Sequence, residues 1–174
     1  MPQIMTERNW SRVFLGLGGN LGDPLNDFRR ARQQLAEHPQ IELLASSPLY
    51  RTPPVGGPAG QPDYLNAVLE LRTSLAAGEL LELCRGIEKA AGRTRELRWG
   101  PRTLDIDLLL FAGLLLDTPE LTIPHPRLQH RHFVLLPLND LAADLTHPQI
   151  GLSVNELLKR LPPAEGISRI MESW

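Results

Sequence analysis

The sequence predicts a single α/β domain of the ferredoxin-like class, with a βαββαβ core, a mostly antiparallel sheet and extra helices toward the C-terminus. Apolar runs of strand length alternate with segments of helical periodicity in that order along the chain. The length of 174 residues suits one domain, residues 1–174, which can bury about 70% of the surface that its unfolded chain exposes. The predicted core strands span residues 13–17, 41–46, 64–73 and 104–111, and the predicted core helices begin at Pro24 and span residues 74–91.

Composition and charge indicate a soluble globular protein without an extended nucleic-acid or membrane surface. The formal net charge is −2, so no broad basic face is expected. The first ten residues lack the apolar stretch of a signal peptide, and no apolar run approaches the ~20 residues that span a bilayer. The single cysteine, Cys84, cannot form an intramolecular disulfide, which suits a reducing compartment. We expect a cytoplasmic monomer with small-molecule partners, no nucleic acid and no membrane.

Local signals mark where the two core helices begin and end. Asp23 is typical of an N-cap and Pro24 of a first helical position, after a glycine turn at residues 18–20. That turn is compatible with phosphate binding, although a plain strand-to-helix turn is the more common explanation. The second helix places Cys84 on its apolar stripe and ends at Gly92. We therefore interpret Cys84 as a core residue.

A long segment rich in proline and glycine, residues 51–63, precedes the third predicted strand. This composition excludes a helix or a central strand, and a loop of this length in a compact domain is typically functional or disordered. We interpret it as a binding wall. In the strand that follows, Tyr64 and Asn66 fall on the less apolar face, where a flat ring beside an amide suits a planar heterocycle. The alternative is a tyrosine at a strand edge and an asparagine that caps a loop.

The basic loop at residues 92–102 is rich in arginine, contains no lysine and carries glycine toward both of its ends. Planar guanidinium groups recognise phosphate oxygens in a bidentate manner. The glycines allow such a loop to close over a nucleotide and exclude water. The alternative is a cluster of surface charges. The functional interpretation predicts a polyphosphate site beside this loop.

Two aspartates, Asp105 and Asp107, lie at the start of the fourth predicted strand. Side chains alternate along a strand, so both carboxylates face one side, with their Cα atoms about 6.6 Å apart. Carboxylates so placed suit a pair of Mg²⁺ ions about 3.5–4 Å apart on a polyphosphate. The alternative is a solvated strand end, but the neighbouring arginines favour the metal and phosphate interpretation. The residues expected on the opposite face are Leu104, Ile106, Leu108 and Leu110.

The remaining segments are a hairpin-like return at residues 114–122, an apolar helix near residues 131–141 and a short closing helix. Ser153 and Glu156 form a capping box at the start of the closing helix. Three histidines lie between residues 125 and 132, but their spacing matches no usual zinc site and they lack cysteine partners. We therefore reject a zinc site there.

Residues 98–111 read Arg-Trp-Gly-Pro-Arg-Thr-Leu-Asp-Ile-Asp-Leu-Leu-Leu-Phe, and this stretch resembles the signature of the 6-hydroxymethyl-7,8-dihydropterin pyrophosphokinase family. Residues 50–54, Tyr-Arg-Thr-Pro-Pro, and the Pro-His pair at 124–125 resemble two further family segments in the expected order. The chain departs from the family pattern at Gly19, where a serine is usual, and at Pro126, where an aromatic residue is frequent. Its basic loop is also one residue shorter.

The resemblance covers about residues 14 to 148 and implies a ferredoxin-like fold and a reaction. The implied reaction transfers the β,γ-diphosphoryl group of ATP to 6-hydroxymethyl-7,8-dihydropterin in folate biosynthesis, leaving AMP, with two Mg²⁺ ions. The implied catalytic residues are Arg93, Arg102, Asp105 and Asp107, with the two aspartates as the metal ligands. The implied ATP contacts are Glu88, Arg95, Trp99, Leu108, Thr122, His125 and Arg131. The implied pterin contacts are Thr52, Pro53, Val55, Tyr64, Asn66, Trp99 and Phe133, with Tyr64 and Phe133 on the two faces of the ring.

Two other functions stay open at this point. A nucleotidyltransferase also uses a glycine turn and an Asp-x-Asp pair on a strand, and it releases pyrophosphate instead of AMP. A non-catalytic ferredoxin-like binding module has the fold but leaves the clustered arginines and aspartates unexplained. Within the family interpretation, the alternative for Glu88 is a surface ion pair with Arg93 or Arg95. Because the basic loop is shorter, the sequence does not assign which phosphate each of these two arginines binds.

Overall fold

The structure, a computed structural model, describes residues 9–92 and 103–174. Predictions that concern residues 1–8 and 93–102 lie outside the described residues. The strands are β1 (Ser11–Gly19), β2 (Ile41–Ser46), β3 (Leu49–Thr52), β4 (Tyr64–Thr73), β5 (Asp105–Phe111), β6 (Leu116–Asp117), β7 (Thr122–Ile123) and β8 (Ser168–Met171). The helices are α1 (Pro24–Glu37), α2 (Ala77–Ala90), the 3-10 helix η1 (Leu128–His130), α3 (His132–Ala142) and α4 (Val154–Arg160).

The main sheet has six strands, and every pairing between its described strands is antiparallel. Its order is β5-β1-β4-β3-β8, and β2 also pairs with β4. The central strands are therefore β1 and β4, with β5 on one side and β2 and β3 on the other. This order confirms the ferredoxin-like βαββαβ core. A separate sheet pairs β6 with β7, which confirms the hairpin-like return.

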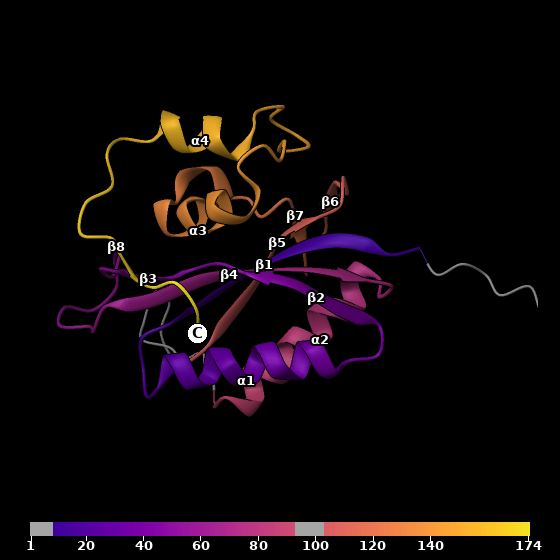
Figure 1. Cartoon of the computed structure of the whole chain (residues 1–174), viewed down its shortest axis with the longest axis horizontal. Coiled ribbons are helices and arrows are strands. Elements are labelled where there is room, and N and C mark those ends of the chain that lie inside the picture. Colours follow the sequence, from indigo (N-terminus) through magenta and orange to yellow (C-terminus); the bar gives the residue numbers. More distant parts are fainter. Residues whose placement is uncertain (1–8, 93–102) are drawn as a thin grey trace, which may run out of the picture.

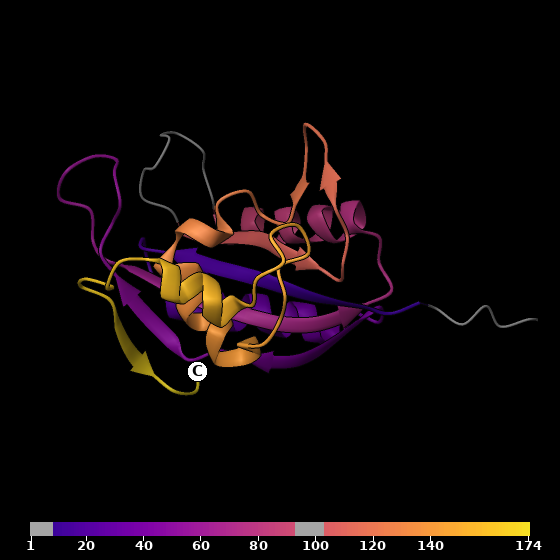
Figure 2. The same ribbon diagram turned by 90° about the horizontal axis from the view of Figure 1, so that it is seen from above.

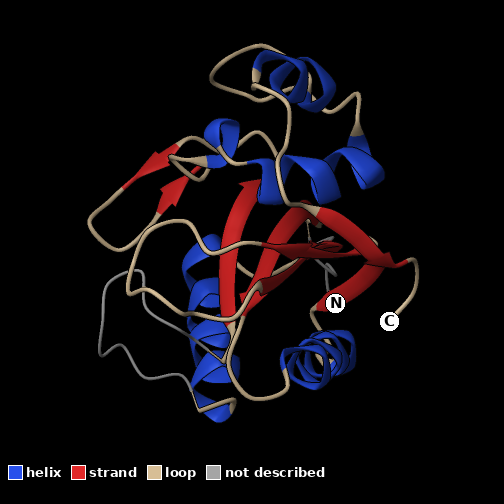
Figure 3. Ribbon diagram, turned by 90° about the vertical axis from the view of Figure 1, so that its left-hand side faces the viewer, coloured by secondary structure: helices blue, strands red, loops and turns tan. Residues whose placement is uncertain are grey.

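Helices cover both faces of the main sheet (Figures 1 and 3). On one face, Leu15 of β1 packs in a core with Phe28 of α1 and Leu80 of α2. On the other face, Phe14 of β1 packs in a second core with Leu135 of α3. Successive residues of β1 thus point to opposite cores, as the period of a strand requires. The second layer, α3 and α4, contains the extra helices that the sequence predicts after the βαββαβ core.

Cys84 lies in the core beneath the sheet, where its side chain is fully buried. Burial is the main cause that raises the pKa of its thiol to about 12. A thiol with that pKa is not a nucleophile at neutral pH. The interpretation of Cys84 as a core residue is therefore confirmed.

The predicted helix starts are confirmed at α1 and α4. Asp23 caps α1 by accepting a hydrogen bond from the main-chain N–H of Asn26, with 3.2 Å between the two atoms. Ser153 and Glu156 exchange the two reciprocal bonds of a capping box, at 3.1 and 2.8 Å. These bonds satisfy N–H groups that the first turn of a helix leaves without partners.

The edge beside β4 is less regular than the sequence predicts. β2 pairs with residues 69–73 of β4 and β3 with residues 64–66, so the two strands form one interrupted edge. Between them, Ser47 Oγ accepts a hydrogen bond from the main-chain N–H of Val68 at 2.8 Å, and Ser47 N–H donates to the Val68 carbonyl at 2.9 Å. The first two residues of the predicted loop at 51–63 belong to β3.

The alternation of β5 breaks near its end. Leu108 and Leu110 pair with consecutive residues of β1, so Leu109 is an extra residue in β5. The prediction that Leu110 shares the face of Ile106 and Leu108 is wrong. The bulge turns both Leu109 and Leu110 toward the core beneath α3.

β8 pairs with β3 and extends the sheet at its edge, and no local sequence pattern predicts it. After β8 the chain returns toward α1, and Trp174 is only 5% exposed (Figure 1). Its indole N–H donates to the carbonyl of Ser47 at 2.8 Å, and its ring meets Phe28 edge-on with 5.9 Å between centroids. The guanidinium of Arg32 lies 4.6 Å from the same ring. Trp174 thereby fastens the sheet edge to α1.

Candidate active site

A cavity of about 870 Å³ lies on the face of the sheet that carries α3. β1, β4 and β5 form its base, and the segment at the start of α3 lies over it. Two loops form its sides, the segment after β3 and the segment before β8, and both lie on the same side of the molecule (Figures 1 and 2). Every predicted pterin-contact residue within the described ranges lines this cavity: Thr52, Pro53, Val55, Tyr64, Asn66 and Phe133.

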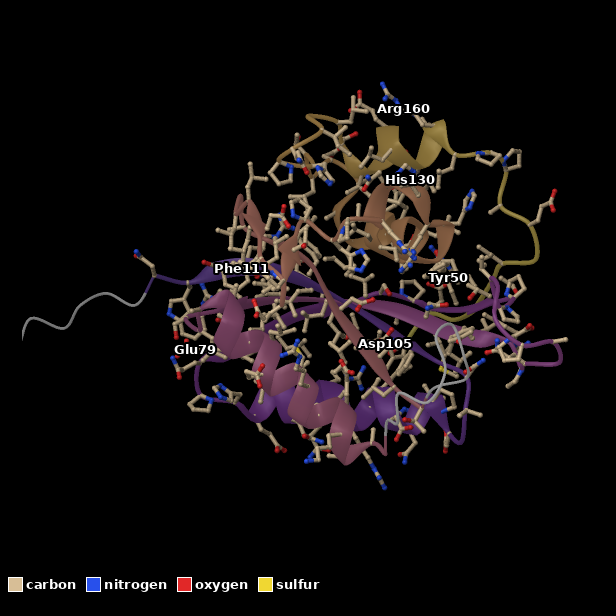
Figure 4. All side chains as sticks on the ribbon, turned by 180° about the vertical axis from the view of Figure 1, so that it is seen from behind. Tyr50, Glu79, Asp105, Phe111, His130 and Arg160 are labelled. Carbon is tan, nitrogen blue, oxygen red and sulfur yellow. The ribbon has the colours of Figure 1, made fainter. Side chains whose placement is uncertain are left out.

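Asp105 and Asp107 both line the cavity from β5, as the strand period predicts. Their partners across the pairing with β1 are glycines, with Gly18 opposite Asp105 and Gly16 opposite Asp107. Cross-strand partners point to the same face, so hydrogen atoms replace side chains beside the two carboxylates. A Cβ on Gly16 would lie 3.4 Å from Leu109 Cδ1 and one on Gly18 would lie 3.2 Å from Asn66 Nδ2, so these two side chains pack over the glycines. Figure 4 marks Asp105 on its strand, with His130 of the overlying η1 segment above it.

His125 lies behind Asp107, with 3.9 Å between His125 Nε2 and Asp107 Oδ2. Its Nδ1 accepts a hydrogen bond from the main-chain N–H of Arg127 at 3.2 Å, so in the neutral ring the proton resides on Nε2. Burial, followed by the positive charge of Arg131, lowers the pKa of His125 from 6.5 to about 4. At neutral pH the side chain is therefore an uncharged donor whose Nε2–H lies beside Asp107.

The polar end of the cavity is organised by Thr52 and Asn66, on the neighbouring strands β3 and β4. Thr52 Oγ1 lies 2.6 Å from Asn66 Oδ1, and both residues are buried. Tyr64 precedes Asn66 by two residues and shares its face of β4. The pair that the sequence predicts on one face is thus brought together in the cavity, which excludes the alternative of a loop-capping asparagine.

Phe133 lines the cavity from α3, and Tyr64 lines it from the sheet. The guanidinium of Arg131 lies 5.4 Å from the centroid of the Phe133 ring, and Arg131 also lines the cavity. Aromatic groups therefore reach the cavity from two layers of the fold, and a cation accompanies one of them.

Of the predicted ATP contacts in residues 9–92 and 103–174, Arg131 lines the cavity and four do not. His125 lies behind Asp107, and the other three are Leu108, Glu88 and Thr122. Leu108 is 3% exposed and packs in the core with α1 and α2, because alternate residues of β5 face the cavity. Glu88 is 5% exposed, and its Oε1 accepts a hydrogen bond from the main-chain N–H of Ile106 at 3.3 Å. It connects α2 to the edge strand β5 and is not a surface residue. Thr122 lies on β7, where its hydroxyl is 3.4 Å from Asp117 Oδ1.

Four predicted residues, Arg93, Arg95, Trp99 and Arg102, lie outside the described residues. Other lining residues were missed by the sequence analysis, notably Arg127 of the segment before η1 and Glu165 of the segment before β8. Local pattern carries no signal for Glu165, because only the pairing of β8 with β3 brings its segment to the cavity.

Across residues 9–92 and 103–174, no helix is long and apolar enough to cross a membrane. The same ranges contain no cluster of three or more His, Cys, Asp or Glu side chains that could hold a metal ion.

Comparisons with known proteins agree with this geometry. Residues 14–143 match the family described as 7,8-dihydro-6-hydroxymethylpterin-pyrophosphokinase (HPPK). The chain is 48% identical over 159 residues to the 2-amino-4-hydroxy-6-hydroxymethyldihydropteridine pyrophosphokinase of Pseudomonas aeruginosa, covering 91% of this chain and 96% of the relative. It is 44% identical over 129 residues to the Bacillus subtilis protein of the same name, covering 74% of this chain and 77% of that relative.

Larger proteins contain a similar region. The chain is 38% identical over 155 residues to the folic acid synthesis protein fol1 of Schizosaccharomyces pombe and spans 21% of its length. Its fold matches a crystal structure of Plasmodium falciparum HPPK-DHPS with a TM-score of 0.67 at 15% identity, covering 90% of this chain and 46% of that one. The structural match supports the fold alone.

Proposed function

We propose roles for the residues of the cavity in this chain, which belongs to the 7,8-dihydro-6-hydroxymethylpterin-pyrophosphokinase family. It transfers the diphosphoryl group of ATP to 6-hydroxymethyl-7,8-dihydropterin in folate biosynthesis. In this reaction the hydroxymethyl oxygen of the pterin forms a bond to the β-phosphorus of ATP. The bond from that phosphorus to the oxygen that it shares with the α-phosphorus breaks, AMP leaves and the hydroxyl proton is released.

Mg²⁺ fits the donor set at Asp105 and Asp107. Mg²⁺ in phosphoryl-transfer sites is typically bound by one or two carboxylates together with substrate phosphates and water, and two carboxylates line this cavity. We therefore assign Asp105 and Asp107 as the ligands of two Mg²⁺ ions. When bound, these ions would neutralise phosphate charge and would lower the pKa of the attacking hydroxyl.

The chain's own cations and donors bind the triphosphate. Arg131 lines the cavity, and His125 presents its Nε2 proton beside Asp107, so both support an ATP site at this end. A neutral His125 donates to a phosphate oxygen without gaining or losing charge during transfer. Arg93 and Arg102 neutralise charge on the transferred group, in this proposal, and arginines in comparable positions contribute about 10³-fold or more. The other proposed ATP contacts are Glu88, Arg95, Trp99, Leu108 and Thr122.

Leu108 and Glu88 have restricted roles within this proposal. The side chain of Leu108 is buried away from the cavity, so only its main chain is available to a nucleotide. Glu88 positions the strand that carries the aspartates, because it accepts the main-chain N–H of Ile106 between them. Both residues therefore act on ATP through the main chain of β5.

The pterin ring lies between Tyr64 and Phe133 in this proposal. Stacking of a base on an aromatic side chain contributes about 1–3 kcal/mol, and the two rings line the cavity from opposite layers. Thr52 and Asn66 meet the polar edge of the ring, and the remaining contacts come from Pro53, Val55 and Trp99. Holding the hydroxymethyl group next to the triphosphate converts a bimolecular reaction into an effectively intramolecular one.

We also propose that the single domain, residues 1–174, acts as a cytoplasmic monomer without nucleic-acid or membrane partners. The buried Cys84, which requires no oxidising compartment, and the net charge of −2 support this assignment. Light scattering coupled to gel filtration tests it. A monomer mass is expected, and a dimer mass contradicts the proposal.

The observation that carries the assignment is the convergence of two carboxylates and two aromatic rings on one cavity. Phosphorus NMR of a reaction with ATP, Mg²⁺ and 6-hydroxymethyl-7,8-dihydropterin tests it. AMP and a pterin diphosphate are expected in equal amounts. Release of pyrophosphate contradicts diphosphoryl transfer and indicates a nucleotidyltransferase.

A further inference from the structure

One side of the cavity is formed by residues 162–167, here called the wall segment, which joins α4 to β8. Pro162, Pro163, Glu165 and Ile167 of this segment line the cavity. The segment follows the residues that match the family, which end at residue 143. Figure 1 shows it descending from α4 along the side of the molecule where β3 meets β4.

The wall segment is held at both of its ends. The carbonyl of Pro162 accepts a hydrogen bond from His132 Nε2 at 2.6 Å, since a carbonyl can only accept. Gly166 has a φ of +71°, and a Cβ built on it would lie 3.3 Å from Pro53 Cγ. A glycine is therefore required there, both by its conformation and by its close packing on Pro53.

The strand that follows fixes the wall segment relative to the sheet. β8 pairs with β3, and Arg169 Nη2 of β8 donates to Asp140 Oδ1 of α3 at 2.5 Å. The Tyr50 hydroxyl of β3 donates to the other oxygen of Asp140. The wall segment is thus tied to β3, the strand that carries Thr52, and to α3, the helix that carries Phe133.

Glu165 is the only acidic residue that lines the described part of the cavity besides Asp105 and Asp107. It lies at the end of the cavity near Pro53, because the next residue, Gly166, packs on Pro53. Within residues 9–92 and 103–174 its carboxylate has no hydrogen-bond or ion-pair partner. A carboxylate so placed is available to accept hydrogen bonds from a ligand.

At the end of the cavity near Pro53, the N–H donors of a bound pterin require a hydrogen-bond acceptor other than Asn66. The oxygen of Asn66 already accepts the Thr52 hydroxyl at 2.6 Å, so the Asn66 amide offers mainly its N–H donors to a ligand. The polar edge of a pterin carries a 4-oxo acceptor and, next to it, N–H and 2-amino donors. Asn66 satisfies the oxo group, and a carboxylate satisfies the amino group.

We propose that Glu165 is a specificity-determining residue that accepts hydrogen bonds from the 2-amino group of the pterin. The proposal rests on the pterin end of the cavity assigned above. The wall segment is then part of the pterin-binding site. The protein recognises the 2-amino group of the pterin in addition to the shape of the ring.

The test compares two ligands that differ at one group, 6-hydroxymethylpterin and 6-hydroxymethyllumazine, which has a 2-oxo group instead of the 2-amino group. Their dissociation constants are measured by calorimetry with the full chain, Mg²⁺ and an α,β-methylene ATP analogue. Wild-type protein is expected to prefer the pterin. The Glu165→Gln variant is expected to bind the pterin ~10-fold more weakly and to bind the lumazine at least as well, because an amide donates to the 2-oxo group.

The matched control is Glu172→Gln, a carboxylate with a 73% exposed side chain beyond the cavity on the same C-terminal segment. It is expected to keep the wild-type preference, and both variants are expected to bind the ATP analogue normally. An unchanged pterin preference in Glu165→Gln and Glu165→Ala overturns the proposal, as does an equal loss of both ligands. Wild-type protein that binds neither ligand contradicts the pterin site itself, which separates that failure from a failure of Glu165.

Discussion

The hydroxyl of Thr52 lies 2.6 Å from Asn66 Oδ1, and the two side chains are only 2% and 7% exposed. The bond connects β3 to β4 at the base of the cavity and fixes which end of the asparagine amide is available to a ligand. A Cβ at Gly18 would lie 3.2 Å from Asn66 Nδ2, so the glycine on β1 provides the space that the Asn66 amide occupies.

Replacement of Thr52 by valine tests the role of this bond, because valine keeps the shape and removes the hydroxyl. The buried Asn66 oxygen then loses a partner, and we expect a loss of about 1–3 kcal/mol in the free energy of unfolding. We also expect a higher dissociation constant for the pterin and an unchanged one for ATP. Thr52→Ser is the matched control, since it keeps the donor. Equal pterin affinity in the serine and valine variants would show that the hydroxyl does not orient Asn66.

Trp174 is expected to carry a large share of the stability of the sheet edge. It is 5% exposed, contacts Phe28 and donates to the carbonyl of Ser47. Truncation to alanine removes a buried ring and leaves a cavity, so we expect the free energy of unfolding to fall by about 3–5 kcal/mol in urea titrations. Trp10, which is 40% exposed, is the control, and Trp10→Ala is expected to change it by less than about 1 kcal/mol. Similar losses for both variants would contradict the described packing.

The buried side chain of His147 is expected to make the free energy of unfolding depend on pH. The side chain is 3% exposed, and its Nδ1 accepts hydrogen bonds from the main-chain N–H groups of Gln149 and Ile150. Burial lowers the pKa of His147 below 6.5. As the pH falls through 6.5, the unfolded chain therefore binds a proton that the folded chain does not, and the free energy of unfolding decreases.

The His147→Asn variant isolates this effect, because an asparagine oxygen accepts from the N–H two residues ahead and does not titrate. Urea titrations at pH 7.5 and pH 5.5 are expected to show a larger loss of stability in the wild type than in His147→Asn. An equal loss in both proteins would assign the pH dependence to other groups.

Local chemistry in the sequence was enough to predict the core elements and the aspartate pair. The period of β5 places Asp105 and Asp107 on one face, and the capping residues Asp23 and Ser153 mark two helix starts. These features are determined by residues only a few positions apart, so the local sequence is sufficient to predict them.

Features that depend on distant residues were missed. β8 is a strand because β3 offers it an edge, and Trp174 is buried because α1 and Ser47 receive it. The bulge at Leu109 likewise arises from pairing with β1, so the alternation of β5 alone predicted the wrong face for Leu110. In each case the structure depends on contact with a residue far away in the sequence, which the local pattern does not contain.

If the Asp105 and Asp107 carboxylates make the cavity catalytic, the variant Asp107→Asn should lose activity. Turnover is measured at saturating Mg²⁺ and ATP. The control is Asp144→Asn, which replaces an exposed aspartate that follows the end of α3. We expect a loss of ~10²-fold or more in kcat for Asp107→Asn, with normal pterin binding and normal activity of the control. Near-normal turnover of Asp107→Asn would contradict it.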